Sequence, residues 1–322
     1  MKPCIWVIDE EWPDYQIEEN ILKQQFPGCT IRYSNYDYAG DLEAFGKEAD
    51  AVLCQVYAHI PRETVERLEK CKIIALFGGG YDRIDVKAAG EKGIPVTFVP
   101  GYCTEDLSDY VLAGIFHFNK RLLSYGSAVS EGLWGAQAVT APVHRVTGST
   151  LLVVGVGRIG TAVAKKARAL GMNVLGYDPY VDAAEMETRG AKKVELSEGL
   201  AAADYVSLNP KYYEETDSLL GWKEFNQMKP TAVIINTSRG KVMVEEDLIR
   251  AVKEKVIAGA VLDVVSNEPP DPKEPIFGVE NIIVTPHISY ISQESFAELK
   301  TRATMNVVKA LKGETLTDLA RY

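Results

Sequence analysis

Short apolar segments alternate with helix-forming segments along most of this chain. Within the first hundred residues, apolar runs with the length of a buried strand lie at 5–8, 30–33, 51–54, 73–77 and 94–99. Segments with helical spacing separate these runs, at 15–25, 41–48, 61–70 and 85–91. Continuous apolar runs of this kind are typical of parallel strands that are covered on both faces. The pattern therefore predicts a doubly wound α/β domain.

The alternation breaks at Pro100-Gly101 and resumes at residue 151. In between, we expect one long helix over 109–127 and an aperiodic stretch over 131–145. Later strands are expected at 205–208, 232–236, 258–263 and 282–284, and later helices at 183–190, 196–202, 223–227, 245–254 and 293–311. A chain of 322 residues exceeds what one hydrophobic core usually holds. We therefore expect two α/β domains, with the first boundary near residues 100–105.

Residues 151–178 carry the most informative local pattern. An apolar strand leads into a glycine-rich turn, an alanine-rich helix follows, and a second apolar strand ends at Asp178. In such a turn Gly155 permits the tight bend, Gly157 lets backbone N–H groups approach a pyrophosphate, and Gly160 lets the helix pack close to the strand. The helix N-terminus favours the phosphate charge, and Asp178 can accept both ribose hydroxyls of an adenosine. The segment predicts a dinucleotide site.

The acid at position 178 also bears on which dinucleotide binds. A carboxylate repels a 2′-phosphate, and the following Pro179-Tyr180-Val181 place no cation beside it. We therefore expect NAD rather than NADP. Glycines also mark ordinary turns, so the alternative at this point is a structural turn in another kind of α/β protein.

Charge and cysteine content narrow the class of protein. The formal net charge is −10, which argues against binding to nucleic acid or to an anionic membrane. The five cysteines show no paired spacing, so we expect no metal site, no disulfides and a reducing compartment, the cytoplasm. The N-terminus does not resemble a signal peptide, and no apolar run approaches the roughly 18 residues of a membrane-spanning helix.

An ionisable residue follows each of the last three predicted strands. These residues are Arg239, Glu268 and His287, after the strands expected at 232–236, 258–263 and 282–284. Ligands of open α/β sheets bind beyond the carboxyl ends of the strands, so the three side chains can converge at one crevice. The glycine-rich turn faces the same edge. Gly79 and Gly80 likewise follow a strand end, in the first domain.

These residue types fit the reduction of a carbonyl group by NADH. His287 can donate a proton to the carbonyl oxygen near neutral pH. Glu268 can favour the charged imidazole and so raise the pKa of His287. Arg239 can bind a carboxylate at two points, and the N–H groups of Gly79 and Gly80 can hold its other oxygen. The predicted substrate is a small 2-oxo acid, or a 2-hydroxy acid in the reverse direction.

Each of the three residues also has an ordinary interpretation when it is taken alone. Arg239 can be a surface arginine in a loop, Glu268 can be solvated beside its prolines, and His287 can be a hydrogen-bonded loop residue. Their common place just beyond buried strands favours the catalytic interpretation over these.

Several stretches are similar to motifs of one enzyme family, the D-isomer-specific 2-hydroxyacid dehydrogenases. They are Gly78-Gly79-Gly80-Tyr81-Asp82-Arg83-Ile84-Asp85, Gly155-Val156-Gly157-Arg158-Ile159-Gly160, Asn236-Thr237-Ser238-Arg239-Gly240, Asp263-Val264-Val265-Ser266-Asn267-Glu268-Pro269 and Thr285-Pro286-His287. The resemblance spans nearly the whole chain. It implies a flavodoxin-like substrate domain, 1–102 plus 293–322, and a Rossmann NAD-binding domain, 103–292, with a cleft between them. It also implies a homodimer built through the cofactor domains, with the arm 131–145 as part of the contact.

The resemblance further implies roles for individual residues. Arg239, Glu268 and His287 would be catalytic. The expected cofactor contacts are Gly155, Gly157, Arg158, Ile159, Gly160, Asp178, Thr237, Ser238, Asp263 and His287, with Asp263 at the nicotinamide amide. The expected substrate contacts are Gly79, Gly80, Tyr57, Tyr102 and Tyr290.

Within the family, residues 285–292 look most like the C-terminal-binding-protein subgroup, which carries an aromatic residue shortly after the histidine. Tyr57 and His59 resemble that subgroup too. Its best-known members are NAD-binding transcriptional corepressors that retain the dehydrogenase residues. Lys211 departs from the family pattern, because most members carry a stretch with His or Cys there. We expect it near the cofactor crevice, with a solvated lysine as the alternative.

Three functions are therefore open from the sequence. The complete set of Arg239, Glu268 and His287 favours an NAD-dependent dehydrogenase that runs as a 2-oxo acid reductase. The subgroup resemblance favours an NAD-sensing scaffold, although the chain lacks the disordered tail expected of one. A relative of alanine or formate dehydrogenases is the third, and Glu268 disfavours it because formate dehydrogenases lack this partner of the histidine.

Overall fold

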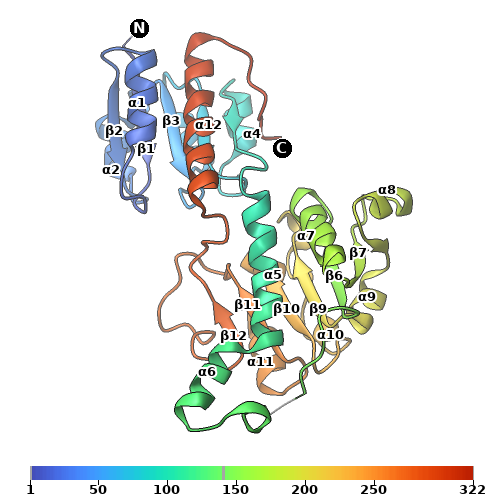
Figure 1. Cartoon of the computed structure of the whole chain (residues 1–322). Coiled ribbons are helices and arrows are strands. Elements are labelled where there is room, and N and C mark those ends of the chain that lie inside the picture. Colours follow the sequence, from blue (N-terminus) through green and yellow to red (C-terminus); the bar gives the residue numbers. More distant parts are fainter. Residues whose placement is uncertain (1, 140–141, 322) are drawn as a thin grey trace. The chain divides into compact units, whose positions relative to one another are not determined.

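The computed structural model describes residues 2–139 and 142–321 (Figure 1). The chain forms two compact units, Met1–Tyr102 with Ile291–Tyr322, and Cys103–Tyr290. Each unit contains one sheet whose strands all run parallel. This confirms the predicted class of two parallel-sheet α/β domains.

The first unit contains a five-stranded sheet in the order β2-β1-β3-β4-β5. Its strands are β1 (Cys4–Ile8), β2 (Thr30–Ser34), β3 (Ala51–Gln55), β4 (Ile74–Phe77) and β5 (Val96–Thr97). Its helices are α1 (Gln16–Gln25), α2 (Ala39–Ala44), the 3-10 turn η1 (Gly46–Glu48), α3 (Arg62–Arg67), α4 (Val86–Glu91) and α12 (Gln293–Lys312). The strand expected over 94–99 is shorter than predicted. Pro95 has no N–H for a ladder, and the Phe98 N–H donates to the Asp318 carbonyl at 3.1 Å instead.

The C-terminal helix completes this first unit. α12 lies beside α1 in Figure 1 and packs against α1, β3 and β4, although nearly 270 residues separate the two helices in sequence. Leu299, Ala303 and Val307 of α12 are fully buried. A long-range return of the chain therefore closes one face of the sheet.

A buried ion pair joins α1 and α12. Glu18 is 1% exposed, and the Lys300 ammonium lies 3.5 Å from its carboxylate. The same ammonium donates to the Asp14 carbonyl at 2.7 Å and lies 5.0 Å from the centre of the Trp12 ring. Burial raises the pKa of Glu18 to about 6, because the loss of water outweighs the attraction of the nearby cation.

We expect Glu18 to make the protein less stable as the pH rises from 5 to 7.5. Its pKa of about 6 in the folded state exceeds the ordinary value of 4.5, so the folded chain binds the proton more tightly than the unfolded chain. Below pH 4.5 the stabilisation that comes from this tighter binding of the proton is fully present, and it is lost as the pH rises through 6. The free energy of unfolding of Glu18→Gln, relative to the natural protein, should therefore increase by about 1 kcal/mol between pH 5 and 7.5.

Denaturant titrations at the two pH values measure this difference. Glu314→Gln, at an exposed position, is the matched control and should show no such change. Parallel pH profiles for Glu18→Gln and the natural protein would contradict the prediction.

The second unit contains a seven-stranded sheet in the order β12-β11-β10-β9-β6-β7-β8. Its strands are β6 (Thr150–Val154), β7 (Asn173–Tyr177), β8 (Lys192–Lys193), β9 (Tyr205–Leu208), β10 (Val233–Asn236), β11 (Gly259–Leu262) and β12 (Ile282–Val284). Its helices are α5 (Thr104–Lys120), α6 (Leu122–Ser130), η2 (Gly135–Ala138), α7 (Arg158–Ala169), α8 (Ala183–Thr188), α9 (Leu196–Ala202), η3 (Glu214–Thr216), α10 (Trp222–Phe225), η4 (Gly240–Val242) and α11 (Glu245–Lys253).

Successive residues of these strands face two separate cores. On β6, Leu151 and Val153 pack with residues of α5 and α7, whereas Leu152 and Val154 pack with residues of α9, α10 and α11. Burial on both faces explains why the strands read as continuous apolar runs. The chain enters the sheet at β6, builds β7 and β8 on one side, and then returns to build β9 on the other. The order of strands therefore reverses between β6 and β9, where α/β sheets open a crevice for ligands.

The prediction of a single helix over 109–127 is wrong. α5 begins five residues earlier, at Thr104, and ends at Lys120, where Arg121 adopts a left-handed conformation with φ 48°. α6 then begins at Leu122 in a new direction (Figure 1). Apolar periodicity continues across Arg121, so the pattern could not reveal the break. The predicted arm 131–145 contains the turn η2 and is otherwise irregular in its described residues; residues 140 and 141 lie outside them.

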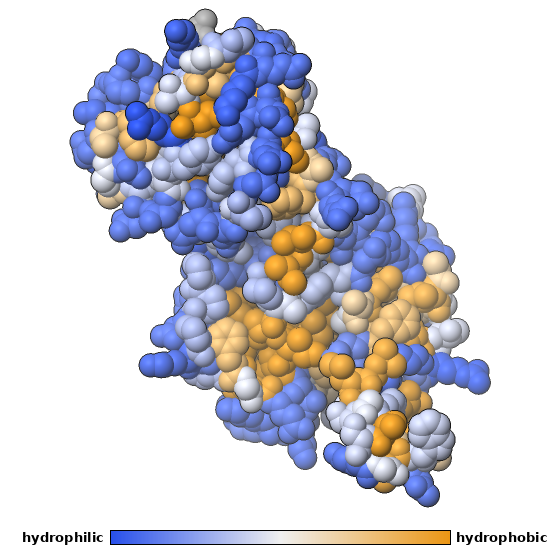
Figure 2. All heavy atoms as spheres, turned by 60° about the vertical axis from the view of Figure 1, so that its left-hand side comes forward, coloured by the Kyte–Doolittle hydropathy of each residue, from blue (hydrophilic) through white to orange (hydrophobic). Residues whose placement is uncertain are grey.

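The segment from α6 to η2 exposes large apolar side chains. Leu122, Leu123 and Trp134 are 76%, 75% and 77% exposed, and hydrophobic surface gathers on this segment at the bottom of Figure 2. Among the described residues, no helix is both long and apolar enough to cross a membrane.

Candidate active site

The glycine-rich turn lies where the strand order reverses. Gly155 follows β6 with φ +81°, and a Cβ atom there would lie 2.6 Å from the backbone nitrogen of Pro210, which follows β9. A Cβ at Gly160, in the first turn of α7, would lie 2.2 Å from the Gly155 carbonyl oxygen. The turn, the helix and the loop after β9 therefore approach so closely that only glycine fits at both positions.

Gly157 differs, because a Cβ there would meet no atom within 4 Å. The space beside its backbone is open, at the N-terminus of α7, where Arg158 and Ile159 are the first two helical residues. Free N–H groups and the helix dipole make this place suited to a pyrophosphate. The contrast between Gly157 and its neighbours is what a phosphate cradle requires.

Asp178 follows β7 and is held by backbone donors. Its Oδ2 accepts the Val156 N–H and its Oδ1 accepts the Tyr180 N–H, both at 3.0 Å. The carboxylate is thereby oriented at the end of the glycine-rich turn, as the binding of ribose hydroxyls needs. Lys211, the residue after Pro210, lies in the loop at the neighbouring strand end.

Two buried oxygens at this edge have no protein partner within the described ranges. They are the Thr237 hydroxyl, after β10, and the Asn209 Oδ1, after β9. The loop that carries Thr237 is braced by Asn236, whose side chain accepts the Ser238 N–H and donates to the Arg239 carbonyl. Buried polar atoms normally have a partner, so these two indicate a ligand with donor groups. The predicted cofactor residues therefore fit a nicotinamide dinucleotide.

The open space at Gly157 and the close contact at Gly160 lead to opposite expectations for alanine. Gly157→Ala should fold with an unchanged melting temperature but should weaken NADH binding by roughly tenfold or more, because the methyl group takes the space of the pyrophosphate. Gly160→Ala should lower the stability by about 1–3 kcal/mol through overpacking. Thermal unfolding and fluorescence titration with NADH separate the two effects. NADH binding by Gly157→Ala at the natural affinity would refute the phosphate assignment.

Glu268 and His287 form a pair beyond β11 and β12. The His287 Nδ1 lies 3.2 Å from the Glu268 Oε2, and both side chains are largely buried. The other carboxylate oxygen of Glu268 accepts the Val265 N–H at 3.1 Å. Burial raises the pKa of Glu268, but His287, the Val265 N–H and Arg239 together outweigh it, so the pKa lies below its usual value. Glu268 is therefore an ionised partner of the imidazole near neutral pH.

Arg239 lies close enough to Glu268 to contribute to that lowered pKa. It is the first residue after the braced Thr237-Ser238 turn, and its guanidinium donates to the Ser238 carbonyl at 2.9 Å. The structure thus brings the three residues expected after β10, β11 and β12 together at one edge of the sheet.

The loop that carries His287 is anchored by Asp263, which is 1% exposed. The carboxylate of Asp263 accepts the N–H groups of Ile288 and Ser289 at 2.9 and 2.8 Å and the Thr285 hydroxyl at 2.6 Å. The nicotinamide contact expected of Asp263 stays a prediction. The anchoring contacts lie within the residue's own unit and were not foreseen.

The expected substrate residues are distributed over both units. Gly79 and Gly80 follow β4, and Tyr57 follows β3, at the carboxyl edge of the first sheet. Tyr102 is the last residue of the first unit before the chain crosses over. Tyr290 stands edge-on to His287, with ring centres 6.3 Å apart. The supporting roles of two side chains were not predicted: Asn236 was quoted only as the first residue of a motif, and Asn209 only follows a strand.

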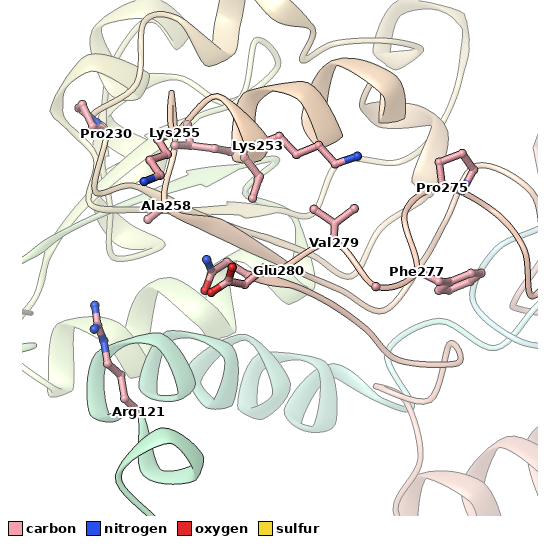
Figure 3. Close-up of a pocket in the computed structure, with 13 residues that line it drawn as sticks. Arg121, Pro230, Lys253, Lys255, Ala258, Pro275, Phe277, Val279 and Glu280 are labelled. Atoms are coloured by element: carbon pink, nitrogen blue, oxygen red, sulfur yellow. The ribbon is translucent and has the colours of Figure 1, made fainter. Parts of the chain in front are cut away.

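A cavity of about 900 Å³ lies at the opposite edge of the second sheet (Figure 3). Arg121, Lys255 and Glu280 are among its lining residues, and it is bounded by the segments that lead into β10, β11 and β12. It is therefore separate from the glycine-rich turn and from His287, which follow the carboxyl ends of the strands. No group of three or more His, Cys, Asp or Glu residues in the described part of the chain is arranged to hold a metal.

Comparison with known proteins agrees with this geometry. Residues 112–289 match the model of the D-isomer specific 2-hydroxyacid dehydrogenase NAD binding domain. A glyoxylate reductase of Korarchaeum cryptofilum is 36% identical over 272 residues, which cover 83% of this chain and 81% of the relative. A hydroxypyruvate reductase of Blautia hydrogenotrophica is 35% identical over 258 residues, which cover 79% and 80%.

Solved structures extend the likeness to both units. The D-lactate dehydrogenase of Aquifex aeolicus, solved with NAD and lactic acid, superposes with a TM-score of 0.84 at 26% identity. The match covers 97% of this chain and 96% of that one. The chain therefore belongs to the D-isomer-specific 2-hydroxyacid dehydrogenase family and is an NAD-dependent oxidoreductase that acts on CH–OH groups.

Proposed function

We propose that this protein reduces small 2-oxo acids to D-2-hydroxy acids, with His287, Glu268 and Arg239 as the catalytic residues. The hydrogen bond between Glu268 and His287, at the sheet edge that also carries the glycine-rich turn, supports the proposal. The names of the relatives, glyoxylate reductase and hydroxypyruvate reductase, support a short 2-oxo acid as the substrate.

Each residue has a distinct task in the reaction. When bound, NADH supplies the hydride that adds to the carbonyl carbon. His287, whose Nδ1 faces Glu268, donates a proton from Nε2 to the carbonyl oxygen and recovers it from solvent afterwards. The negative charge of Glu268 stabilises the protonated imidazole before donation. The Arg239 guanidinium binds the substrate carboxylate and orients the adjacent carbonyl.

The remaining assignments belong to the same proposal. Gly79, Gly80, Tyr57, Tyr102 and Tyr290 bind the substrate, and Arg158, Ile159, Thr237, Ser238 and Asp263 contact the cofactor. The exposed apolar side chains of α6 and of Trp134, just before η2, support a homodimer through the second unit. Five free cysteines agree with a cytoplasmic location.

Oxidation of NADH with a panel of 2-oxo acids tests the activity. Glyoxylate, hydroxypyruvate, pyruvate and larger aliphatic and aromatic acids form the panel, and NADH binding is measured on the same sample. We expect turnover with the short acids and the D-isomer of the product. Absence of turnover with every acid, from protein that binds NADH, would exclude the proposal.

Asp178 should control the choice between NADH and NADPH. Asp178→Asn keeps an acceptor for the Val156 N–H but removes the charge that repels a 2′-phosphate. The ratio of kcat/KM for NADH over NADPH should fall by about tenfold or more. Asp182→Asn is the matched control, since Asp182 caps α8 and asparagine caps a helix equally well. An unchanged ratio in Asp178→Asn would place the selectivity elsewhere.

One observation favours a second candidate, the corepressor-like role of the C-terminal-binding-protein subgroup. Tyr290 stands edge-on to His287, as an aromatic residue that partly covers a substrate pocket would. In this candidate NADH binding governs association with a protein, and catalysis is dispensable. Partners that bind only with NADH, equally for the natural protein and His287→Asn, would support it.

A further inference from the structure

Tyr110 links the first helix of the second unit to the loop that carries His287. α5 begins directly after the chain leaves the first unit at Tyr102, and residues 285–290 are the last of the second unit before the chain returns. The Tyr110 hydroxyl forms a short hydrogen bond with the Thr285 hydroxyl, across 175 positions of sequence. One side chain thus ties together the two segments at which the chain crosses between units.

The direction of this hydrogen bond follows from the next one. The Thr285 hydroxyl lies 2.6 Å from the Asp263 Oδ1, and a carboxylate can only accept. A threonine hydroxyl has one hydrogen, and it is used toward Asp263, so Tyr110 must be the donor to Thr285. Burial, aided by the charge of Asp263, raises the pKa of Tyr110 to about 12. Tyr110 therefore keeps its proton over the working range of pH.

These hydrogen bonds hold the backbone both before and after His287. Asp263 holds Thr285 by its hydroxyl and Ile288 and Ser289 by their N–H groups. Between these anchors His287 has φ +51°, a left-handed conformation that is costly for a residue with a Cβ atom. The anchors supply the contacts that keep this conformation, and with it the approach of Nδ1 to Glu268.

We propose that Tyr110 is a positioning residue for His287, acting from α5 through the Thr285 hydroxyl and the Asp263 carboxylate. This inference rests on the proposed role of His287 as the proton donor. The Tyr110 hydroxyl bonds to Thr285, two residues before His287, so in this proposal it affects the reaction by fixing where the imidazole lies. The ring of Tyr110 packs against the core beside α5, so a phenylalanine fills the same volume and removes the hydroxyl alone.

The test compares Tyr110→Phe, Thr285→Val and the double variant. Loss of one neutral hydrogen bond at the site should lower kcat about five- to tenfold in Tyr110→Phe, with the dissociation constant of NADH unchanged. The double variant should be no slower than Thr285→Val, because Tyr110 acts through Thr285. Thr285→Ser, which keeps the hydroxyl, should restore most of the rate. Tyr205→Phe, which removes a hydroxyl bonded to Asn119 in the same unit, is the control.

A measurement without turnover completes the test. The chain has four histidines, so the imidazole resonances can be followed by NMR in protein with labelled histidine. Tyr110→Phe should shift or broaden the resonance of His287 and leave those of the other three in place. The inference is wrong if Tyr110→Phe leaves the His287 resonance in place and has the kcat of the natural protein. It is also wrong if the double variant is slower than Thr285→Val by the same factor that Tyr110→Phe alone loses.

His287→Asn is measured in the same series so that two failures can be told apart. If His287→Asn is inactive while Tyr110→Phe behaves as the natural protein, only the role of Tyr110 fails. If His287→Asn keeps its activity, the proposed function fails and the positioning role fails with it.

Discussion

Replacement of His287 by asparagine is expected to lower kcat for 2-oxo acid reduction by about 10²- to 10⁴-fold. Asparagine has no proton to donate near neutral pH, but it tolerates a left-handed backbone better than most residues, so the loop at φ +51° should persist. The substitution leaves Glu268 and the glycine-rich turn unchanged. NADH affinity and melting temperature should therefore stay close to natural values while turnover is lost.

Steady-state and single-turnover oxidation of NADH measure this effect at the chemical step. His144→Asn makes the same change at an exposed loop position and should be without effect. A single-turnover rate within threefold of natural in His287→Asn would assign proton donation to another group. The pH profile adds a second criterion, since a profile set by a histidine should lose its alkaline limb in the variant.

Replacement of Arg239 by lysine should lower kcat/KM for 2-oxo acids by about 100-fold. A guanidinium binds a carboxylate through two parallel hydrogen bonds, whereas an ammonium binds it as a point charge, and charge-assisted bonds contribute about 1.5–3 kcal/mol each. Lysine keeps the positive charge that helps to hold the pKa of Glu268 low, so the carboxylate partner of His287 stays ionised. The loss should appear in both KM and kcat, because the clamp also orients the carbonyl.

Kinetics with saturating NADH separate this effect from cofactor binding. Arg250→Lys is the matched control, since Arg250 lies over the Trp222 ring and pairs with Glu254 on the outer face of α11. A change confined to the affinity for NADH would reassign Arg239 to the cofactor. A variant with natural kcat/KM would remove it from the substrate site altogether.

The residues predicted best are those whose chemistry is local in the sequence. The strand, turn, helix and strand from β6 to β7 lie within 28 consecutive residues, so spacing alone led to the prediction of Gly155, Gly157, Gly160 and Asp178 as cofactor residues. Arg239, Glu268 and His287 were also predictable, because each follows an apolar run and parallel strands direct their carboxyl ends to one edge. The hydrogen bond of 3.2 Å between Glu268 and His287 depends on the tertiary structure, which places their two loops side by side.

Two features of the structure could not be predicted from the hydrophobic pattern of the sequence. The break between α5 and α6 depends on one left-handed residue, Arg121, while the apolar spacing runs on through it. Asp263 anchors the His287 loop, and Tyr110 bonds to Thr285 of that loop, but these residues are far apart in sequence and no single motif contains both partners of either contact.

The sequence by itself thus determined the class of fold and predicted the glycine-rich turn and the ionisable groups at the strand ends, because side-chain periodicity and strand-end chemistry are local properties. Tertiary structure alone decided the order of the strands, which reverses between β6 and β9, and the orientation of His287. These depend on contacts such as Tyr110 with Thr285 and Asp178 with Val156, which form only when distant segments pack together.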